Sequence, residues 1–111
     1  MNGPYVAAGL SMTTPLPGQD HRSGPYFQFT DDLASGGTLY YAIRNADDGS
    51  PEDGVTAVLM HDRGGLPDQT VAKLSSSVSS VTVEIGIEKG ANYYLEDPVA
   101  DDAFVVVFGT G

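Results

Sequence analysis

The amino-acid sequence predicts an all-β fold, an antiparallel β-sandwich of jelly-roll type with about seven strands and an extended N-terminal arm. Short runs of β-branched and aromatic residues recur along the chain, and turn-forming Gly, Pro and Asp residues separate them. No run has the period of an amphipathic helix. A chain of 111 residues supports one core between two layers. We therefore expect a β-sandwich domain at residues 25–111, preceded by the arm at residues 1–24.

The expected arm is rich in proline and glycine. Pro4, Pro15 and Pro17 exclude a regular helix there. Apolar side chains are nevertheless spread along the segment, whereas a free disordered tail is usually more polar. We therefore expect the arm to hold an oligomer together or to contact a shell. The residues expected to make that contact are Tyr5, Val6, Leu10 and Met12.

The first three expected strands follow the arm. Residues 26–30 are rich in aromatic side chains and end at two aspartates. Residues 38–44 begin after a Gly-Gly turn. Residues 55–61 follow the polar loop 45–54 and are apolar enough for a central strand. Each run therefore has a turn signal on both sides.

Four further strands complete the predicted sandwich. A turn containing Gly and Pro leads into residues 70–74. Residues 92–95 and 103–108 are two aromatic and apolar runs near the end of the chain. Between them and the 70–74 strand, residues 80–87 alternate between apolar and polar side chains, which indicates a strand with one buried face. The apolar face of that strand consists of Val81, Val83, Ile85 and Ile87.

The charge of the chain is its most unusual property. There are 15 acidic residues against 5 basic ones, which gives a formal net charge of −10. Repulsion among these charges opposes compaction in dilute buffer. In about 1 M salt the Debye length falls to roughly 3 Å, and most of the repulsion is screened. Abundant Asp with scarce Lys therefore favours a protein that works in concentrated salt, and an ordinary acidic surface is the alternative.

The composition also excludes several classes of protein. Phosphate backbones are bound through clustered Lys and Arg, whereas the basic residues here are scattered, so we expect no nucleic-acid partner. No run reaches the ~20 apolar residues of a membrane-spanning helix, so we expect no membrane insertion. The first residues lack the basic start of a signal peptide, so we expect no cleaved leader. Because cysteine is absent, disulfides and thiolate metal sites are excluded.

No catalytic motif stands out in the sequence. His61 precedes Asp62 and His21 follows Asp20, but neighbouring residues of a strand point to opposite faces. No G-x-S-x-G elbow supplies a nucleophile, and two histidines without H-E-x-x-H spacing do not indicate a zinc site. Chance pairs among so many carboxylates do not indicate a glycosidase. We therefore expect a protein that is not an enzyme and needs no cofactor.

The polar loop at residues 45–54 leaves one metal site open. Ca²⁺ prefers several hard oxygen ligands from flexible loops. The loop lacks the spacing of an EF-hand, and a solvated acidic loop is the simpler interpretation. The residues that could bind Ca²⁺ or Na⁺ are Asp47, Asp48, Glu52 and Asp53.

The tyrosines of the expected strands leave a second possibility open. Exposed rings stack on sugars, but packing in a core or an interface is the simpler explanation for most of them. The adjacent pairs Tyr40-Tyr41 and Tyr93-Tyr94 place one ring inward and one outward. A carbohydrate platform requires an exposed Tyr40 or Tyr94 in a groove.

The chain ends with a glycine, an alternating Tyr/Leu strand, an acidic turn and a closing aromatic-Val strand. These features are formed by Gly90, Tyr93, Leu95 and residues 103–107. The ending resembles the pre-peptidase C-terminal type of β-sandwich, a module appended to secreted proteins, over residues 26–108. The chain departs from that pattern at Pro98, and it has Phe104 where Trp is common. The resemblance implies the sandwich fold and a non-catalytic role, and it assigns no functional residue.

In architecture and composition the chain also resembles decoration or turret proteins on the capsids of viruses that infect halophilic archaea. The short sandwich, the arm with its apolar side chains and the salt-adapted charge support this interpretation. We expect a non-enzymatic structural protein on the virion surface, with further copies of itself and a major capsid or other shell protein as its partners. The alternative is an extracellular β-sandwich module that binds carbohydrate or a cell-surface polymer.

Overall fold

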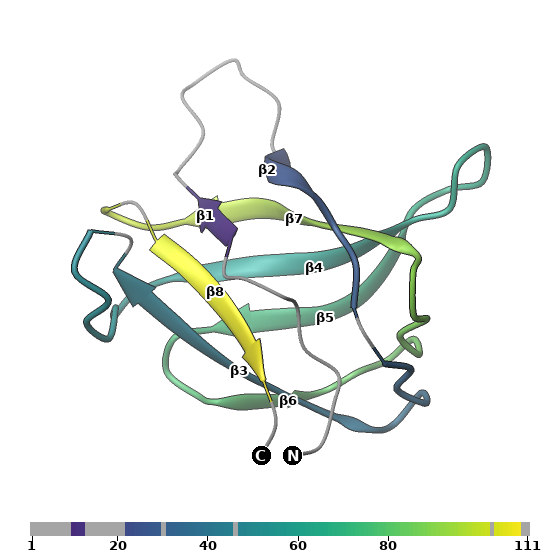
Figure 1. Ribbon diagram of the computed structural model, residues 1–111, viewed down its shortest axis with the longest axis horizontal. Helices are drawn as coiled ribbons and strands as arrows, with labels where there is room; N and C mark the ends of the chain where they lie inside the picture. Colours follow the sequence, from purple (N-terminus) through teal and green to yellow (C-terminus); the bar gives the residue numbers. More distant parts are fainter. Residues whose placement is uncertain (1–9, 13–21, 30, 46, 103, 110–111) are drawn as a thin grey trace.

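Eight β-strands build the part of the chain that the computed structural model describes, residues 10–12, 22–29, 31–45, 47–102 and 104–109 (Figure 1). Within these ranges no segment is helical, and none could cross a lipid bilayer as a helix. The strands are β1 (Leu10–Met12), β2 (Arg22–Phe27), β3 (Thr38–Asn45), β4 (Thr56–Asp62), β5 (Gln69–Ser75), β6 (Ser80–Thr82), β7 (Asn92–Val99) and β8 (Phe104–Gly109).

The strands form two four-stranded antiparallel sheets that pack face to face (Figure 1). Sheet A has the order β1-β8-β3-β6, and sheet B has the order β2-β7-β4-β5. The chain crosses between the sheets at most connections, and its last strands insert between strands formed much earlier. This order is that of a jelly roll, in which two Greek keys interlock. The predicted fold class is therefore confirmed.

The N-terminal segment contributes more to the sandwich than its composition indicates. Strand β1 pairs with β8 along the edge of sheet A, and β2 begins at Arg22, within the segment expected to be an arm. Strand β1 has no predicted counterpart and brings the number of strands to eight, whereas β2 overlaps the predicted 26–30 run and begins earlier. Local secondary-structure propensity does not predict strand structure in this segment, because its backbone hydrogen bonds go to strands that are distant in the sequence.

Strict alternation places the core between the two sheets. In β3, Leu39, Tyr41 and Ile43 are buried while their neighbours face outward, and Phe104, Val106 and Phe108 repeat the pattern in β8. Sheet B supplies the opposite wall. Its buried side chains include Ala57, Leu59, Val71, Leu74, Tyr93 and Leu95. The alternation of apolar and polar residues in the sequence therefore places one side of each sheet in a core between two layers.

Aromatic rings fill one end of this core. Phe29 lies at the centre, with its ring centroid 5.2 Å from that of Tyr93 and 5.1 Å from that of Phe108. Phe27 stacks on Phe108 at 5.6 Å. The edge-to-face and stacked geometries are those that aromatic quadrupoles favour. The predicted 26–30 strand thus supplies a central part of the core, although β2 itself ends at Phe27.

The alternating run at 80–87 forms a strand only as far as Thr82. Val83 and Ile87 are buried as predicted, but their backbones pair with the turn at 33–37 and not with another strand. Leu33 and Ile87 exchange backbone hydrogen bonds of 2.9 and 2.7 Å. Gly86 permits this approach, because a Cβ there would lie 3.0 Å from the Leu33 carbonyl oxygen.

Candidate functional site

The carboxylates are distributed unequally between the two sheets. Among the acidic residues that the structure describes, only Asp62, Glu96 and Asp97 lie in strands, and all three belong to sheet B. The four strands of sheet A contain no Asp or Glu, and their single charged residue is Arg44. The other acidic residues that the structure describes lie in the connections between strands. Sheet A therefore presents the least acidic strand surface.

Residues of β3 and β8 build the outward side of sheet A, which we call the sheet A outer face. Ala42 lies opposite Val107 and Arg44 lies opposite Val105, while Tyr40 continues the same side of β3. Tyr40 is 38% exposed and Val107 is 39% exposed. Apolar and aromatic atoms thus face outward beside one cation. This face is the first candidate interaction surface.

The outward side of sheet B is built differently, from tyrosine–carboxylate pairs. The Tyr26 hydroxyl donates to the Asp62 carboxylate, and the Tyr94 hydroxyl donates to the Asp68 carboxylate. The two rings meet edge to face with centroids 5.8 Å apart. The first hydrogen bond joins β2 to β4, and the second joins β7 to the loop before β5. We regard this cluster as a structural cross-brace of sheet B.

The tyrosines that the structure describes do not form a shared sugar-binding platform. One ring of the first adjacent pair is buried and the other exposed, as predicted for Tyr41 and Tyr40, but both rings of the second pair, Tyr93 and Tyr94, are buried. Tyr94 is only 4% exposed, and the other exposed ring, Tyr26, lies on the opposite sheet from Tyr40. Rings on opposite sides of the sandwich cannot stack on one ligand.

The acidic loop after β3 is held by hydrogen bonds within itself. The Asn45 side-chain oxygen accepts from the backbone N–H of Asp47 at 2.8 Å, and Asp48 accepts from the Ser50 backbone N–H and hydroxyl at 2.9 and 2.7 Å. The hydrogen bond from the Ser50 hydroxyl is the main reason why the pKa of Asp48 lies below its ordinary value. The Asn45 amide also donates to Glu52 at 2.8 Å.

Two of the four loop carboxylates, those of Asp48 and Glu52, thus accept hydrogen bonds from within the loop. Among the side chains that the structure describes, no three or more His, Cys, Asp or Glu residues form a group that could hold a metal ion. The Ca²⁺ or Na⁺ site expected at Asp47, Asp48, Glu52 and Asp53 stays a prediction, and the geometry of the loop adds nothing to it.

His61 and Asp62 point away from each other, as neighbours in a strand should. The His61 ring stacks on Tyr93 with centroids 4.8 Å apart and planes 24° apart. Asp62 accepts hydrogen bonds from Tyr26 and from the Gly64 backbone N–H on the other side of the sheet. Each partner has a structural role at the end of β4. His21 lies outside the described residues.

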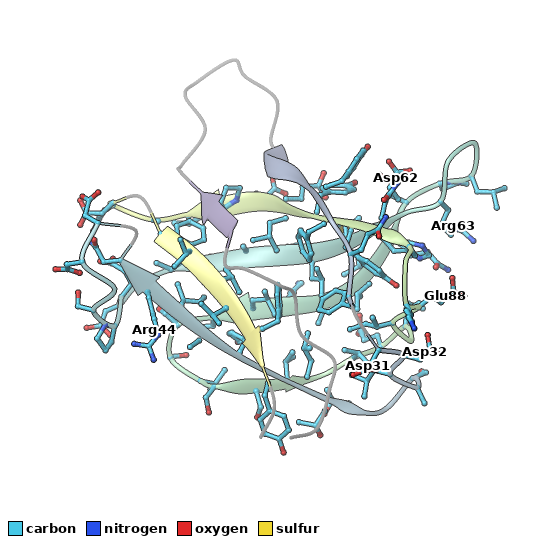
Figure 2. All side chains as sticks on the ribbon, viewed as in Figure 1. Asp31, Asp32, Arg44, Asp62, Arg63 and Glu88 are labelled. Atoms are coloured by element: carbon cyan, nitrogen blue, oxygen red, sulfur yellow. The ribbon has the colours of Figure 1, made fainter. Side chains whose placement is uncertain are left out.

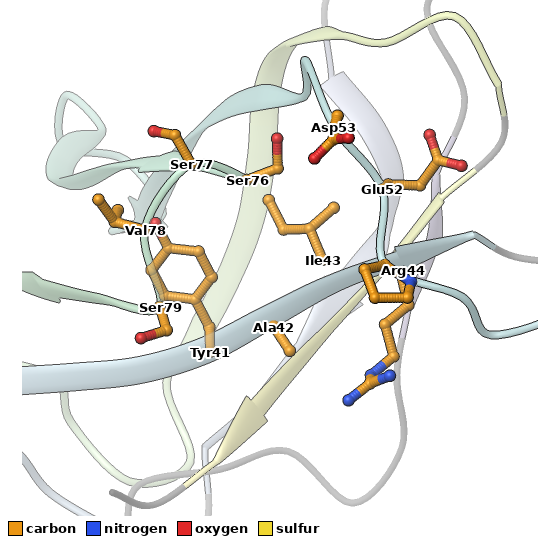
Figure 3. Close-up of a pocket in the computed structure, with 11 residues that line it drawn as sticks. Tyr41, Ala42, Ile43, Arg44, Glu52, Asp53, Ser76, Ser77, Val78 and Ser79 are labelled. Carbon is orange, nitrogen blue, oxygen red and sulfur yellow. The ribbon is translucent and has the colours of Figure 1, made fainter.

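A cavity of about 400 Å³ opens beside β3 (Figure 3). Ala42 and Ile43 form its floor, the serines of the 76–79 turn form one wall, and Glu52 and Asp53 form the other (Figure 3). The Tyr41 hydroxyl donates to the Ser75 carbonyl at 2.9 Å and accepts from the Ser75 N–H at 2.8 Å, so its ring anchors the serine wall. The cavity is a gap between two connections that cover the edge of β3.

The structure describes the arm residues only in part. Leu10 and Met12 lie in β1, where their backbones pair with Val106 and Phe104 of the same chain. Tyr5 and Val6 lie outside the described residues. The contact of these four residues with another subunit stays a prediction.

Sequence reasoning missed the sheet A outer face. The distribution of acidic residues was not a sufficient signal, because almost all of the predicted runs lack acid and only the run 80–87 contains one, Glu84. What the sequence could not tell is that the runs 38–44 and 103–108 are neighbours. Figure 2 shows Arg44 at the end of the sandwich opposite Asp62, Arg63 and Glu88, pointing away from the core.

No protein-family model, curated protein or solved structure matches this chain. The resemblance to pre-peptidase C-terminal sandwiches and to capsid decoration proteins therefore stays a prediction.

Proposed function

We propose that this chain is a non-enzymatic structural subunit of a virion, a decoration or turret protein on the capsid of a virus that infects a halophilic archaeon. The charge layout carries the proposal. The net charge is −10, yet the strands of sheet A contain no carboxylate. A protein with this charge distribution has one face suited to contact with another protein, while the rest of its surface is suited to concentrated salt.

Concentrated salt is the environment in which this charge becomes tolerable. In about 1 M salt the Debye length is roughly 3 Å, so carboxylates on neighbouring loops no longer repel strongly. Exposed carboxylates keep the protein hydrated and soluble where apolar surfaces would associate. The exposed acidic loop residues include Asp31, Asp47, Asp53, Asp101 and Asp102.

The jelly-roll topology adds support by analogy. Jelly rolls recur in viral capsid proteins, and also in lectins and cupins, so the fold alone does not decide between them. The acid-free sheet favours the capsid reading, because a subunit that sits on a shell needs a surface for protein contacts. A carbohydrate-binding role has no aromatic platform to support it in the described strands.

The test is the molar mass of the full chain in about 3 M KCl, where charge screening is strong. Size-exclusion chromatography with light scattering should give a discrete homo-oligomer, because subunits of a closed assembly associate with fixed symmetry. A chain that stays monomeric at every concentration and in high salt would contradict the proposal. A broad, concentration-dependent distribution of masses would contradict it as well.

A further inference from the structure

Two observations together characterise the sheet A outer face, although the side chains of Leu66, Val78 and Val99 elsewhere are more exposed than its apolar residues. It exposes Tyr40 and Val107 to more than a third of their full surface, with Ala42 and Val105 half-buried between them. It also lacks carboxylates, in a chain where acidic residues outnumber basic ones by 15 to 5. Apolar strand residues that face outward side by side are characteristic of a surface that another protein covers.

Charge selects the partner that can cover this face. In concentrated salt the long-range repulsion between two copies of a chain with net charge −10 is screened, but burying a carboxylate in an interface still costs desolvation. That cost is smallest when both copies turn their acid-free sheets toward each other, because the acidic connections then lie at the rims. Arg44 adds an attractive contribution, since its guanidinium has five N–H donors and is the one charged group in the strands of sheet A.

We propose that the sheet A outer face is the self-association surface of this protein, with sheet A of one copy packed on sheet A of a second copy. The inference rests on the homo-oligomer of the proposed function and specifies the interface within it. An isologous two-fold contact uses the same patch on both copies. Face-to-face packing of two sheets also extends the arrangement that the sandwich itself uses.

The register of β3 suggests how the two copies lie. A two-fold axis that runs across the strands at the level of Ala42 and Val107 brings each of these residues opposite its own copy. Tyr40 and Arg44 lie two residues to either side of Ala42, so Arg44 of one copy meets Tyr40 of the other in a cation–π contact. The acidic loops after β3 then lie at opposite ends of the interface.

The first test compares two variants that add the same charge to exposed valines. Val107→Asp places a carboxylate at the centre of the proposed interface, whereas Val99→Asp places one in sheet B, where the side chain is 59% exposed. By light scattering in concentrated KCl, Val107→Asp should lower the molar mass about twofold and Val99→Asp should leave it unchanged. Thermal melting of both variants checks that each still folds.

The second test uses the absence of cysteine from the chain. Val107→Cys should link two copies through a short bis-maleimide, and Val99→Cys should not. Cross-linking of Val107→Cys is measured on the intact oligomer. A folding defect, which in Val107→Asp would also lower the molar mass, cannot produce a cross-linked dimer.

The outcomes separate this inference from the proposed function. A monomeric wild-type chain overturns both. A wild-type oligomer whose mass is unaffected by Val107→Asp, or that is dissociated by Val99→Asp instead, overturns only the assignment of the interface. Cross-linking of Val99→Cys in preference to Val107→Cys has the same meaning and would indicate that copies associate through sheet B.

Discussion

The Tyr93 hydroxyl lies at the boundary between the core and the connection before β7. Its ring is fully buried between His61 and Phe29, and its oxygen accepts a hydrogen bond from the Glu88 backbone N–H at 2.8 Å. Burial raises the pKa of the phenol above its ordinary value of 10.0, and the negative charges of Glu88 and Asp32 raise it further, while the hydrogen bond from Glu88 lowers it in part. The stability of the fold therefore depends on pH in the alkaline range in which the Tyr93 phenol ionises.

The sign of that pH dependence follows from the raised pKa. In the unfolded chain the phenol ionises near pH 10, whereas in the folded chain it stays neutral to higher pH. The contribution of Tyr93 to stability is therefore complete below pH 10 and is lost as pH rises through the folded-state pKa.

Tyr93→Phe tests this pH dependence. The variant should lose about 1 kcal/mol at neutral pH, because the Glu88 N–H loses its acceptor. It should also show a smaller further loss of stability above pH 10 than the wild type. Urea unfolding across the alkaline range measures both effects, with Tyr40→Phe as the control at an exposed ring. Equal alkaline losses in Tyr93→Phe and the wild type would contradict the assignment.

At the scale of elements, alternation and turn residues predicted the central strands well. The expected runs 38–44 and 55–61 became β3 and β4, each displaced by one residue at most at either end. Strand β7 extends beyond the predicted 92–95 and includes Pro98. Asp97 there has a φ of 50°, and the pairing with β4 shifts register nearby, so a bulge accommodates the proline in a central strand. Local propensity cannot foresee a bulge of this kind.

The turn at 33–37 is the element that ends β6 early, and Gly37 is its tightest point. A Cβ at Gly37 would lie 2.7 Å from Leu33 Cδ1 and 2.9 Å from the Ala34 carbonyl oxygen. The Gly37 carbonyl also accepts from the Val83 N–H at 3.0 Å, so a shift of the turn disturbs both segments.

Gly37→Ala should therefore destabilise the fold by about 1–3 kcal/mol, the usual cost of overpacking. Gly65→Ala is the matched control, because a Cβ at Gly65 meets no atom within 4 Å. Chemical denaturation of the two variants measures the difference. If both lose the same free energy of unfolding, the turn does not have the tight packing described here.

At the scale of the whole molecule, the sequence predicted how much charge the protein carries but not where the uncharged surface lies. The acid-free runs that became β3 and β8 are about 60 residues apart in the sequence, and only the jelly-roll order makes them neighbours. The same order brings β1 to the edge of sheet A. A surface formed by strands distant in sequence needs the topology before its function can be argued.

The account depends most on the claim that this anionic sandwich is built for concentrated salt. The direct test is the melting temperature of the full chain between about 0.1 and about 3 M KCl, a range in which the Debye length falls from roughly 10 Å to below 3 Å. A variant with Asp47, Asp53 and Asp101 replaced by Asn is the control, since it removes exposed charge from loops without touching the core. The melting temperature of the wild type should rise throughout the range, and that of the variant should rise less. A wild-type melting temperature that stays constant or falls would contradict the account.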